Sequence, residues 1–299
     1  MPLRYFIKNA GLINAAGTEA IDFLNRMSTN DLRKFGADEF RKTVLTTDKG
    51  RIVDLVNVLN TKEGVIILTS GDFQDKVISH LEKYIIMDDV SLKKSDRNYV
   101  MISIFTEDPV KTGKDLFETE INKGRVCLIN NEDFLFTDEF RVMTLNIVCR
   151  SENLLKYKSI LKDIKEIDSD EYDYFRIESG IPEGKNELNE NINPVECGLE
   201  RYISFKKGCY IGQEVIARLD SQSKIPKQMV KLTPEGQVFC EDKIYDDQNS
   251  ECGFISSVAE MNNKFLSLGF IRSTNLDFER HYSTENKNGK IKLNILKIN

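Results

Sequence analysis

Residues 207–214 read Lys207-Gly208-Cys209-Tyr210-Ile211-Gly212-Gln213-Glu214, the most unusual local chemistry in the chain. Two glycines bracket one thiol, and glycine allows sharp turns and close backbone approach to a ligand. The adjacent lysines and the start of a helix at Glu214 would stabilise a thiolate at Cys209. The segment therefore leaves two alternatives, a reactive cysteine or a structural cysteine buried in a glycine-rich turn.

Upstream of this segment, a helix is predicted over residues 170–178. It should stop at Ser179-Gly180-Ile181-Pro182, because glycine suits a left-handed cap and proline cannot continue a helix. This places Glu178 at the helix exit. Residues 181–204 have no regular pattern, and a long connection of this kind more often serves a site.

The first part of the chain predicts a sheet with flanking helices. Thr18 is expected to cap a helix that ends near residue 30. Residues 41–47 and 52–60 form a predicted hairpin around Asp48-Lys49-Gly50. A strand at 65–68 and a helix with the apolar stripe Phe73, Val77, Leu81 and Tyr84 should follow.

A second cycle of strands begins at residues 99–105 and continues through weaker strands near Val126 and Phe134 to residues 142–148. A helix capped by Ser151 follows, and it should turn Leu154, Leu155, Ile160 and Leu161 toward the sheet.

From Gln228 onward, short strands alternate with turn residues, which favours a small antiparallel barrel. We therefore expect two domains, residues 1–225 and residues 226–299, with the boundary near Pro226.

The amino-acid composition argues against some classes of function. The 299 residues are 40% apolar and 30% charged, with a formal charge of −6, as in an ordinary globular protein. The acidic balance argues against DNA as a partner, and no apolar run approaches the ~20 residues of a membrane span. The first residues match no targeting pattern, so a cytoplasmic location is expected.

Metal and disulfide chemistry are not expected. The six cysteines form no C-x-x-C pair, so neither a disulfide framework nor a zinc ribbon is indicated. The two histidines, His80 and His281, show no metal-site pattern.

The residues 207–214 resemble the K-G-C-[FY]-x-G-Q-E motif of the YgfZ family, which is related to the aminomethyltransferases of the glycine cleavage system. Residues 175–182 resemble the family's R-[IL]-E-x-G segment, and Asn193-Pro194-Val195-Glu196 its N-P-x-E segment. Residues 23–32 and 45–52 are similar to the opening of the wider aminomethyltransferase family. The resemblance covers nearly the whole chain.

This resemblance implies an α+β, aminomethyltransferase-like folate-binding fold, with two α/β subdomains around a central channel and a C-terminal small antiparallel β-barrel. It also implies tetrahydrofolate or a derivative as cofactor. A buried carboxylate can accept two hydrogen bonds from a pterin edge, and Glu178, which matches the family's helix-end glutamate, is expected to be that buried group. The remaining candidates are Arg51, Lys206, Lys207 and Arg218 for the anionic glutamate tail, Tyr210 for stacking, Gln213 and Glu214 for holding the loop, and Asp54.

The sequence differs from the aminomethyltransferases at one position that matters for their reaction. The aminomethyltransferases carry two consecutive Asp residues after the Gly-rich turn, the second of them catalytic, where this chain has Asp54-Leu55. Leucine cannot transfer a proton, which argues against glycine cleavage as the activity.

The YgfZ resemblance instead implies a monomeric accessory factor for assembly or repair of 4Fe–4S clusters in client proteins, including radical enzymes that modify tRNA. In this hypothesis Cys209 acts transiently on a client and Lys207 tunes it. Two alternatives remain, namely a one-carbon transferase that uses Asp54 and an interaction scaffold without folate.

Overall fold

The computed structural model describes residues 2–62, 64–129, 133–221 and 225–298. The chain divides into two compact units, Met1–Ile167 with Tyr202–Gln213, and Asp168–Arg201 with Glu214–Asn299. The segment 202–213, which holds most of the cysteine motif, thus belongs with the first part of the chain. The domain boundary near Pro226 stays a prediction, and the first barrel strand begins at Lys227.

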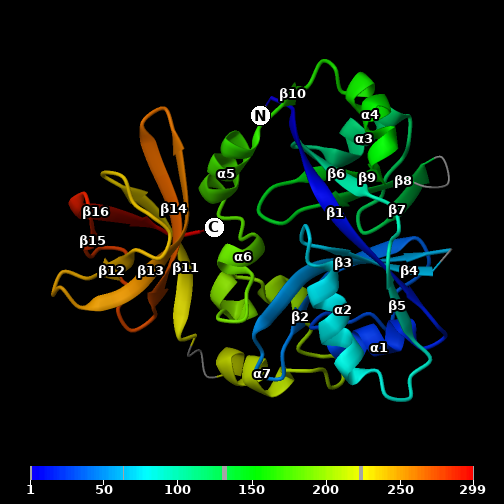
Figure 1. The fold of residues 1–299 in the computed structure, drawn as a ribbon, viewed down its shortest axis with the longest axis horizontal. Helices are drawn as coiled ribbons and strands as arrows, with labels where there is room; N and C mark the ends of the chain where they lie inside the picture. The colour runs from blue at the N-terminus through cyan, green and yellow to red at the C-terminus, as the bar shows by residue number, and fades with distance from the viewer. Residues whose placement is uncertain (1, 63, 130–132, 222–224, 299) are drawn as a thin grey trace. The chain divides into compact units, whose positions relative to one another are not determined.

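The first unit is built on a ten-stranded sheet, in which eight strands follow the order β2-β3-β4-β1-β6-β9-β8-β7. The other two, β5 and β10, both pair with β1 outside this order. The long strand β1 joins its two halves, because residues 11–15 pair with β4 and residues 4–10 pair with β6 (Figure 1). The strands are β1 (Arg4–Ala16), β2 (Glu39–Thr46), β3 (Ile52–Thr61), β4 (Gly64–Thr69), β5 (Ser91–Lys94), β6 (Tyr99–Phe105), β7 (Val126–Ile129), β8 (Asp133–Asp138), β9 (Thr144–Arg150) and β10 (Lys165–Glu166).

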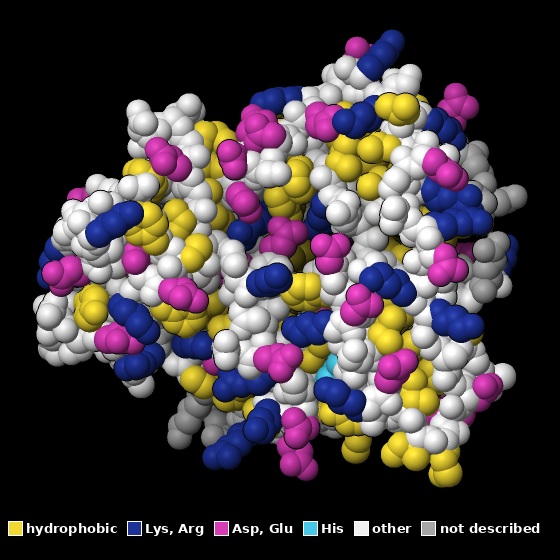
Figure 2. All heavy atoms as spheres, in the orientation of Figure 1, with side chains coloured by type: hydrophobic (Ala, Val, Ile, Leu, Met, Phe, Trp, Pro, Cys, Tyr) yellow, Lys and Arg dark blue, Asp and Glu magenta, His cyan; other side chains and the backbone are white. Residues whose placement is uncertain are grey.

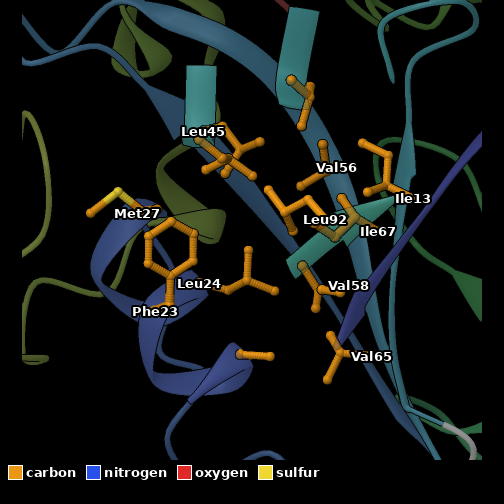
Figure 3. Close-up of a cluster of buried hydrophobic side chains, with 14 of the residues drawn as sticks. Ile13, Phe23, Leu24, Met27, Leu45, Val56, Val58, Val65, Ile67 and Leu92 are labelled. Carbon is orange, nitrogen blue, oxygen red and sulfur yellow. The ribbon is translucent and has the colours of Figure 1, made fainter. Parts of the chain in front are cut away.

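Helices cover this sheet, and α1 (Ala20–Met27) packs on the half that contains β3. Figure 3 shows Leu24 of α1 pointing toward the strands that carry Val56 and Val58, and Phe23 and Met27 belong to the same buried cluster. The position of α1 matters for the site described below. The other helical segments are α2 (Gln74–Leu81), η1 (Glu82–Tyr84), α3 (Pro109–Phe117), η2 (Ser151–Asn153) and α4 (Leu154–Ile160).

The predicted hairpin is confirmed, since β2 and β3 are antiparallel and Gly50 occupies a positive φ of 63° in their turn. Three details were wrong. Ser151 does not cap α4, because its hydroxyl donates to the carbonyl of Asn98 and Asn153 holds the N-cap position. Thr18 does not cap α1, because its hydroxyl donates to Asp89 instead. Leu155 does not face the sheet, because one 3-10 turn precedes α4 and shifts the buried position to Tyr157.

The second unit contains a closed antiparallel barrel with the order β11-β14-β13-β12-β15-β16, as the turn-rich tail predicted. Its interior is apolar, with Val230, Leu232, Ile255 and Ile271 among the buried residues. The helix α5 (Ser169–Glu178) begins with a capping box at Asp168 and ends before Gly180, which has a positive φ of 70°. The remaining elements are α6 (Gly184–Glu187), η3 (Pro194–Cys197), η4 (Glu200–Tyr202), α7 (Gln213–Ser221), β11 (Lys227–Pro234), β12 (Lys243–Tyr245), β13 (Glu251–Met261), β14 (Lys264–Arg272), β15 (Tyr282–Asn286) and β16 (Gly289–Leu296).

The molecular surface carries mixed charge. Figure 2 shows basic and acidic side chains interspersed over the face in view, without a wide area of one sign. Among the described residues, no helix combines the length and the apolar character needed to cross a bilayer.

Candidate functional site

The cysteine motif is fastened to the end of α1 by Lys207. Its ammonium donates to three backbone carbonyl oxygens, those of Asn25 at 2.5 Å, Ser28 at 2.7 Å and Asn30 at 2.6 Å. The last carbonyls of a helix have no partner within the helix. Lys207 therefore supplies the missing donors at this end of α1 and ties residue 207 to the helix.

Two opposing effects act on the protonation of the Lys207 amino group. Burial lowers its pKa to about 7, since the Lys207 side chain is 5% exposed. Three carbonyl acceptors favour the ammonium, because only the protonated group has three N–H donors. All three donors are used at the end of α1 and on the residues that follow it, so the hydrogen bonds of Lys207 hold the loop and do not reach the thiol.

The rest of the motif is held by backbone contacts in the same unit. The N–H of Ile211 donates to the carbonyl of Arg26 at 3.0 Å, and the Ile211 carbonyl accepts from the Thr46 hydroxyl at 2.9 Å. Gln213 folds back and accepts from the Tyr210 N–H at 3.3 Å. The loop is thus attached to α1 and to the β2–β3 hairpin.

Gly212 is required where the loop meets the hairpin. Its φ is 78°, and a Cβ there would lie 2.6 Å from the carbonyl oxygen of Thr47 and 2.9 Å from the Cα of Gly50. Gly208 differs, because a Cβ there would have its nearest neighbour at 3.8 Å, the flexible guanidinium end of Arg33.

We expect Gly212→Ala to lower the free energy of unfolding by about 2–3 kcal/mol, from the left-handed backbone and the backbone clash combined. Gly208→Ala is the matched control and should change it by less than about 0.5 kcal/mol. Urea denaturation of both variants checks this. Equal stability of the two variants would show that the approach of Gly212 to the hairpin is not needed.

This anchored loop presents Cys209 to solvent. Cys209 and Cys240 are the exposed cysteines, whereas Cys149, Cys197 and Cys252 are buried and Cys127 is half-buried. Burial raises the pKa of Cys149 to about 12 and that of Cys252 to about 11. Of the two alternatives left open for Cys209, its exposure agrees with a cysteine available for reaction.

Asp54 lies on β3 and is fully buried. Its carboxylate accepts from the N–H of Leu55 at 2.8 Å and from the N–H of Ser70 at 2.9 Å. Burial raises its pKa to about 6. These bonds connect β3 to the turn after β4, and they leave the carboxylate enclosed by protein.

Comparing the wild type with Asp54→Asn at two pH values tests the raised pKa of Asp54. The folded state takes up a proton near pH 6, whereas the unfolded chain does so near 3.8. The stability of the wild type relative to Asp54→Asn should therefore rise by about 1 kcal/mol as the pH falls from 7 to 5. Urea unfolding at both pH values measures this difference, and a difference that does not vary with pH would contradict the assignment.

The other candidates are dispersed. Tyr210 is buried, which raises its pKa to about 12, and its ring centroid lies 5.0 Å from Nζ of Lys207. Arg51 is half-buried beside the hairpin turn. Glu178 and Glu214 belong to the second unit, and both side chains are exposed. Glu178 was expected to be buried, but only its carbonyl is engaged, with Lys231 Nζ at 2.8 Å.

The second unit holds a buried polar network that sequence reasoning missed. The Glu187 carboxylate accepts from the hydroxyls of Ser256 and Ser257, both at 2.6 Å, and lies 3.5 Å from Arg176 Nη1. Arg176 also donates to Asp173 at 2.5 Å. This network joins α5 and α6 to β13. Only the helix periodicity that points Arg176 inward could have suggested it.

Metal ligands do not gather anywhere in the part of the chain that the structure describes, where no group of three or more His, Cys, Asp or Glu side chains could hold an ion. The candidate site is the exposed thiol of Cys209 on a loop held by hydrogen bonds. Carboxylates and cations lie near it in sequence.

Comparison with known proteins defines the class of fold. The chain has the fold of the aminomethyltransferases: the glycine cleavage system aminomethyltransferase T from Bartonella henselae aligns over 99% of this chain and 86% of its own, with a TM-score of 0.84 and 14% identity. The predicted fold class is thereby confirmed. No family model matches the chain.

Sequence relatives agree with this class. An aminomethyltransferase of Thermoanaerobacter sp. (strain X514) is 25% identical over 238 residues, which cover 71% of this chain and 62% of that protein. The aminomethyltransferase of Aquifex aeolicus (strain VF5) is 27% identical over 265 residues, covering 83% and 70%. The matched region thus spans about three fifths of the first of these relatives.

Proposed function

We propose that this protein binds tetrahydrofolate or a derivative and acts as a YgfZ-type accessory factor for 4Fe–4S clusters in client proteins. The proposal rests on one observation: the thiol of Cys209 is exposed to solvent, on a loop that the buried ammonium of Lys207 holds in place. A thiol that acts on another protein has to be accessible and well positioned. One cysteine cannot supply the four thiolates of a cluster, so its action on a client is transient.

The residues have distinct roles in this proposal. Lys207 and Gln213 hold the loop, and Cys209 contacts the client. Glu178 accepts hydrogen bonds from the pterin, for which an exposed carboxylate at a helix end is available. Arg218, which belongs to the same unit as Glu178, attracts the anionic tail of folate.

A matched pair of variants tests the role of Cys209. In cells that lack the native protein, Cys209→Ser should lower the activity of a 4Fe–4S client, such as a radical enzyme that modifies tRNA, at least fivefold. Cys240→Ser removes the other exposed thiol and should leave that activity unchanged. Both purified variants should bind tetrahydrofolate as the wild type does. Client activity that is indifferent to Cys209 would refute the proposal.

A second candidate, transfer of a one-carbon unit to or from tetrahydrofolate, is favoured by the names of the relatives. Its acid–base group would be Asp54. A general acid or base must lie within hydrogen-bond reach of the substrate, whereas the Asp54 carboxylate is fully buried and bonds to protein groups, among them the N–H groups of Leu55 and Ser70. Turnover of folate by the purified protein without a client, lost in Asp54→Asn, would favour this candidate.

A further inference from the structure

The segment between η1 and β5 exposes two large apolar side chains. Ile86 is 85% exposed and Met87 is 93% exposed, the highest values among the exposed large hydrophobic residues that the structure describes. Single exposed apolar residues are common on protein surfaces. Two adjacent ones, both almost fully in water, call for an explanation.

The segment that carries them is rigidly attached. The carboxylate of Asp89 accepts from the Thr18 N–H at 2.8 Å and from its hydroxyl at 2.7 Å, and the Asp89 N–H donates to Glu19 at 2.7 Å. Asp88 forms an ion pair with Arg26. On both sides of the pair, Ile85 and Val90 pack against the buried core of the first unit.

The same helix holds the cysteine loop. The Arg26 side chain forms the ion pair with Asp88, and the Arg26 carbonyl accepts a hydrogen bond from the N–H of Ile211. Lys207 donates to the carbonyls around the end of the same helix. A helix of eight residues is about 12 Å long. Both loops are therefore attached to one short helix. A protein partner typically covers about 800 Å² on each side of an interface.

The geometry points to the Ile86–Met87 pair as a docking site for the client protein on which Cys209 acts, an inference that rests on the proposed function. The client would offer an apolar recess bordered by Lys or Arg, because two carboxylates, Asp88 and Asp89, directly follow the pair. Glu19 and Asp22 lie on the part of the chain that binds this segment. The cations nearest in sequence are Lys83 before the pair, and Lys93 and Lys94 on β5. This acidic border disfavours an anionic lipid surface as the occupant.

The double variant Ile86→Ser/Met87→Ser tests the inference. Neither side chain contributes to the core, so the unfolding transition and the affinity for tetrahydrofolate should match the wild type. Activity of the radical 4Fe–4S enzyme in cells, read as the amount of its modified nucleoside in tRNA, should fall at least threefold. Leu155→Ser, at a residue 79% exposed on α4, is the matched control and should have no effect.

The outcomes separate this inference from the proposed function. If Cys209→Ser lowers client activity and the double variant does not, the docking site is wrong and the function stands. If Cys209→Ser has no effect, the proposed function fails and the inference falls with it.

Photocrosslinking from position 87 in cells identifies the occupant. Attachment to the iron–sulfur protein whose activity depends on Cys209 supports the docking site. Attachment to a second copy of this chain overturns it. Flotation of the purified protein with anionic phospholipid vesicles, lost in the double variant, would also overturn it in favour of a membrane.

Discussion

Replacing Lys207 by methionine is expected to lower the free energy of unfolding by about 3–5 kcal/mol, because each buried acceptor left without a donor costs about 1–3 kcal/mol. Methionine keeps the length and the apolar contacts of the side chain but cannot donate to Asn25, Ser28 and Asn30. The cysteine loop should also become a site of rapid cleavage by protease.

Lys206→Met is the control for this prediction, since Lys206 is adjacent and exposed. Its effect on urea unfolding should stay within about 0.5 kcal/mol. If both variants unfold at the same urea concentration as the wild type, the three carbonyl contacts contribute nothing to stability. The role of Lys207 would then be a direct effect on Cys209.

Glu187→Ala should destabilise the second unit by about 3–5 kcal/mol, the typical result of removing one partner from a buried ion pair. The loss leaves the buried guanidinium of Arg176 with less compensating charge and leaves two buried hydroxyls, Ser256 and Ser257, without their acceptor.

Thermal unfolding of Glu187→Ala measures this effect, with Glu260→Ala as an exposed acidic control in the same unit. Glu187→Gln retains an acceptor and should fall between the wild type and the alanine variant. An alanine variant as stable as Glu260→Ala would show that the network does not hold α5 and α6 to the barrel.

The fold could be predicted from the sequence where local pattern and tertiary contacts agree. The β2–β3 hairpin, the end of α5 at Gly180 and the barrel all follow from turn residues and alternating apolar positions. The predictions for Thr18 and Leu155 were wrong for two different reasons. A distant partner, Asp89, takes the hydroxyl of Thr18, and one extra turn before α4 rotates the helix face.

The candidate site was found from sequence only in part. The glycine-bracketed cysteine was evident, and Gly212 has the backbone conformation that glycine permits. The partners of Lys207 are main-chain oxygens about 180 residues away, which no side-chain pattern encodes. The network around Glu187 was missed because it joins residues 176, 187, 256 and 257, which come together only in the folded unit.

The most direct test is calorimetric titration of the purified wild-type protein with tetrahydrofolate, beside Glu178→Gln and Glu260→Gln, a control at an exposed carboxylate of the same unit. Saturable one-to-one binding that weakens at least tenfold in Glu178→Gln and is unchanged in Glu260→Gln is the predicted result. Absence of binding to the wild type would contradict the claim that this protein is a folate-binding factor and would leave the aminomethyltransferase fold as an interaction scaffold.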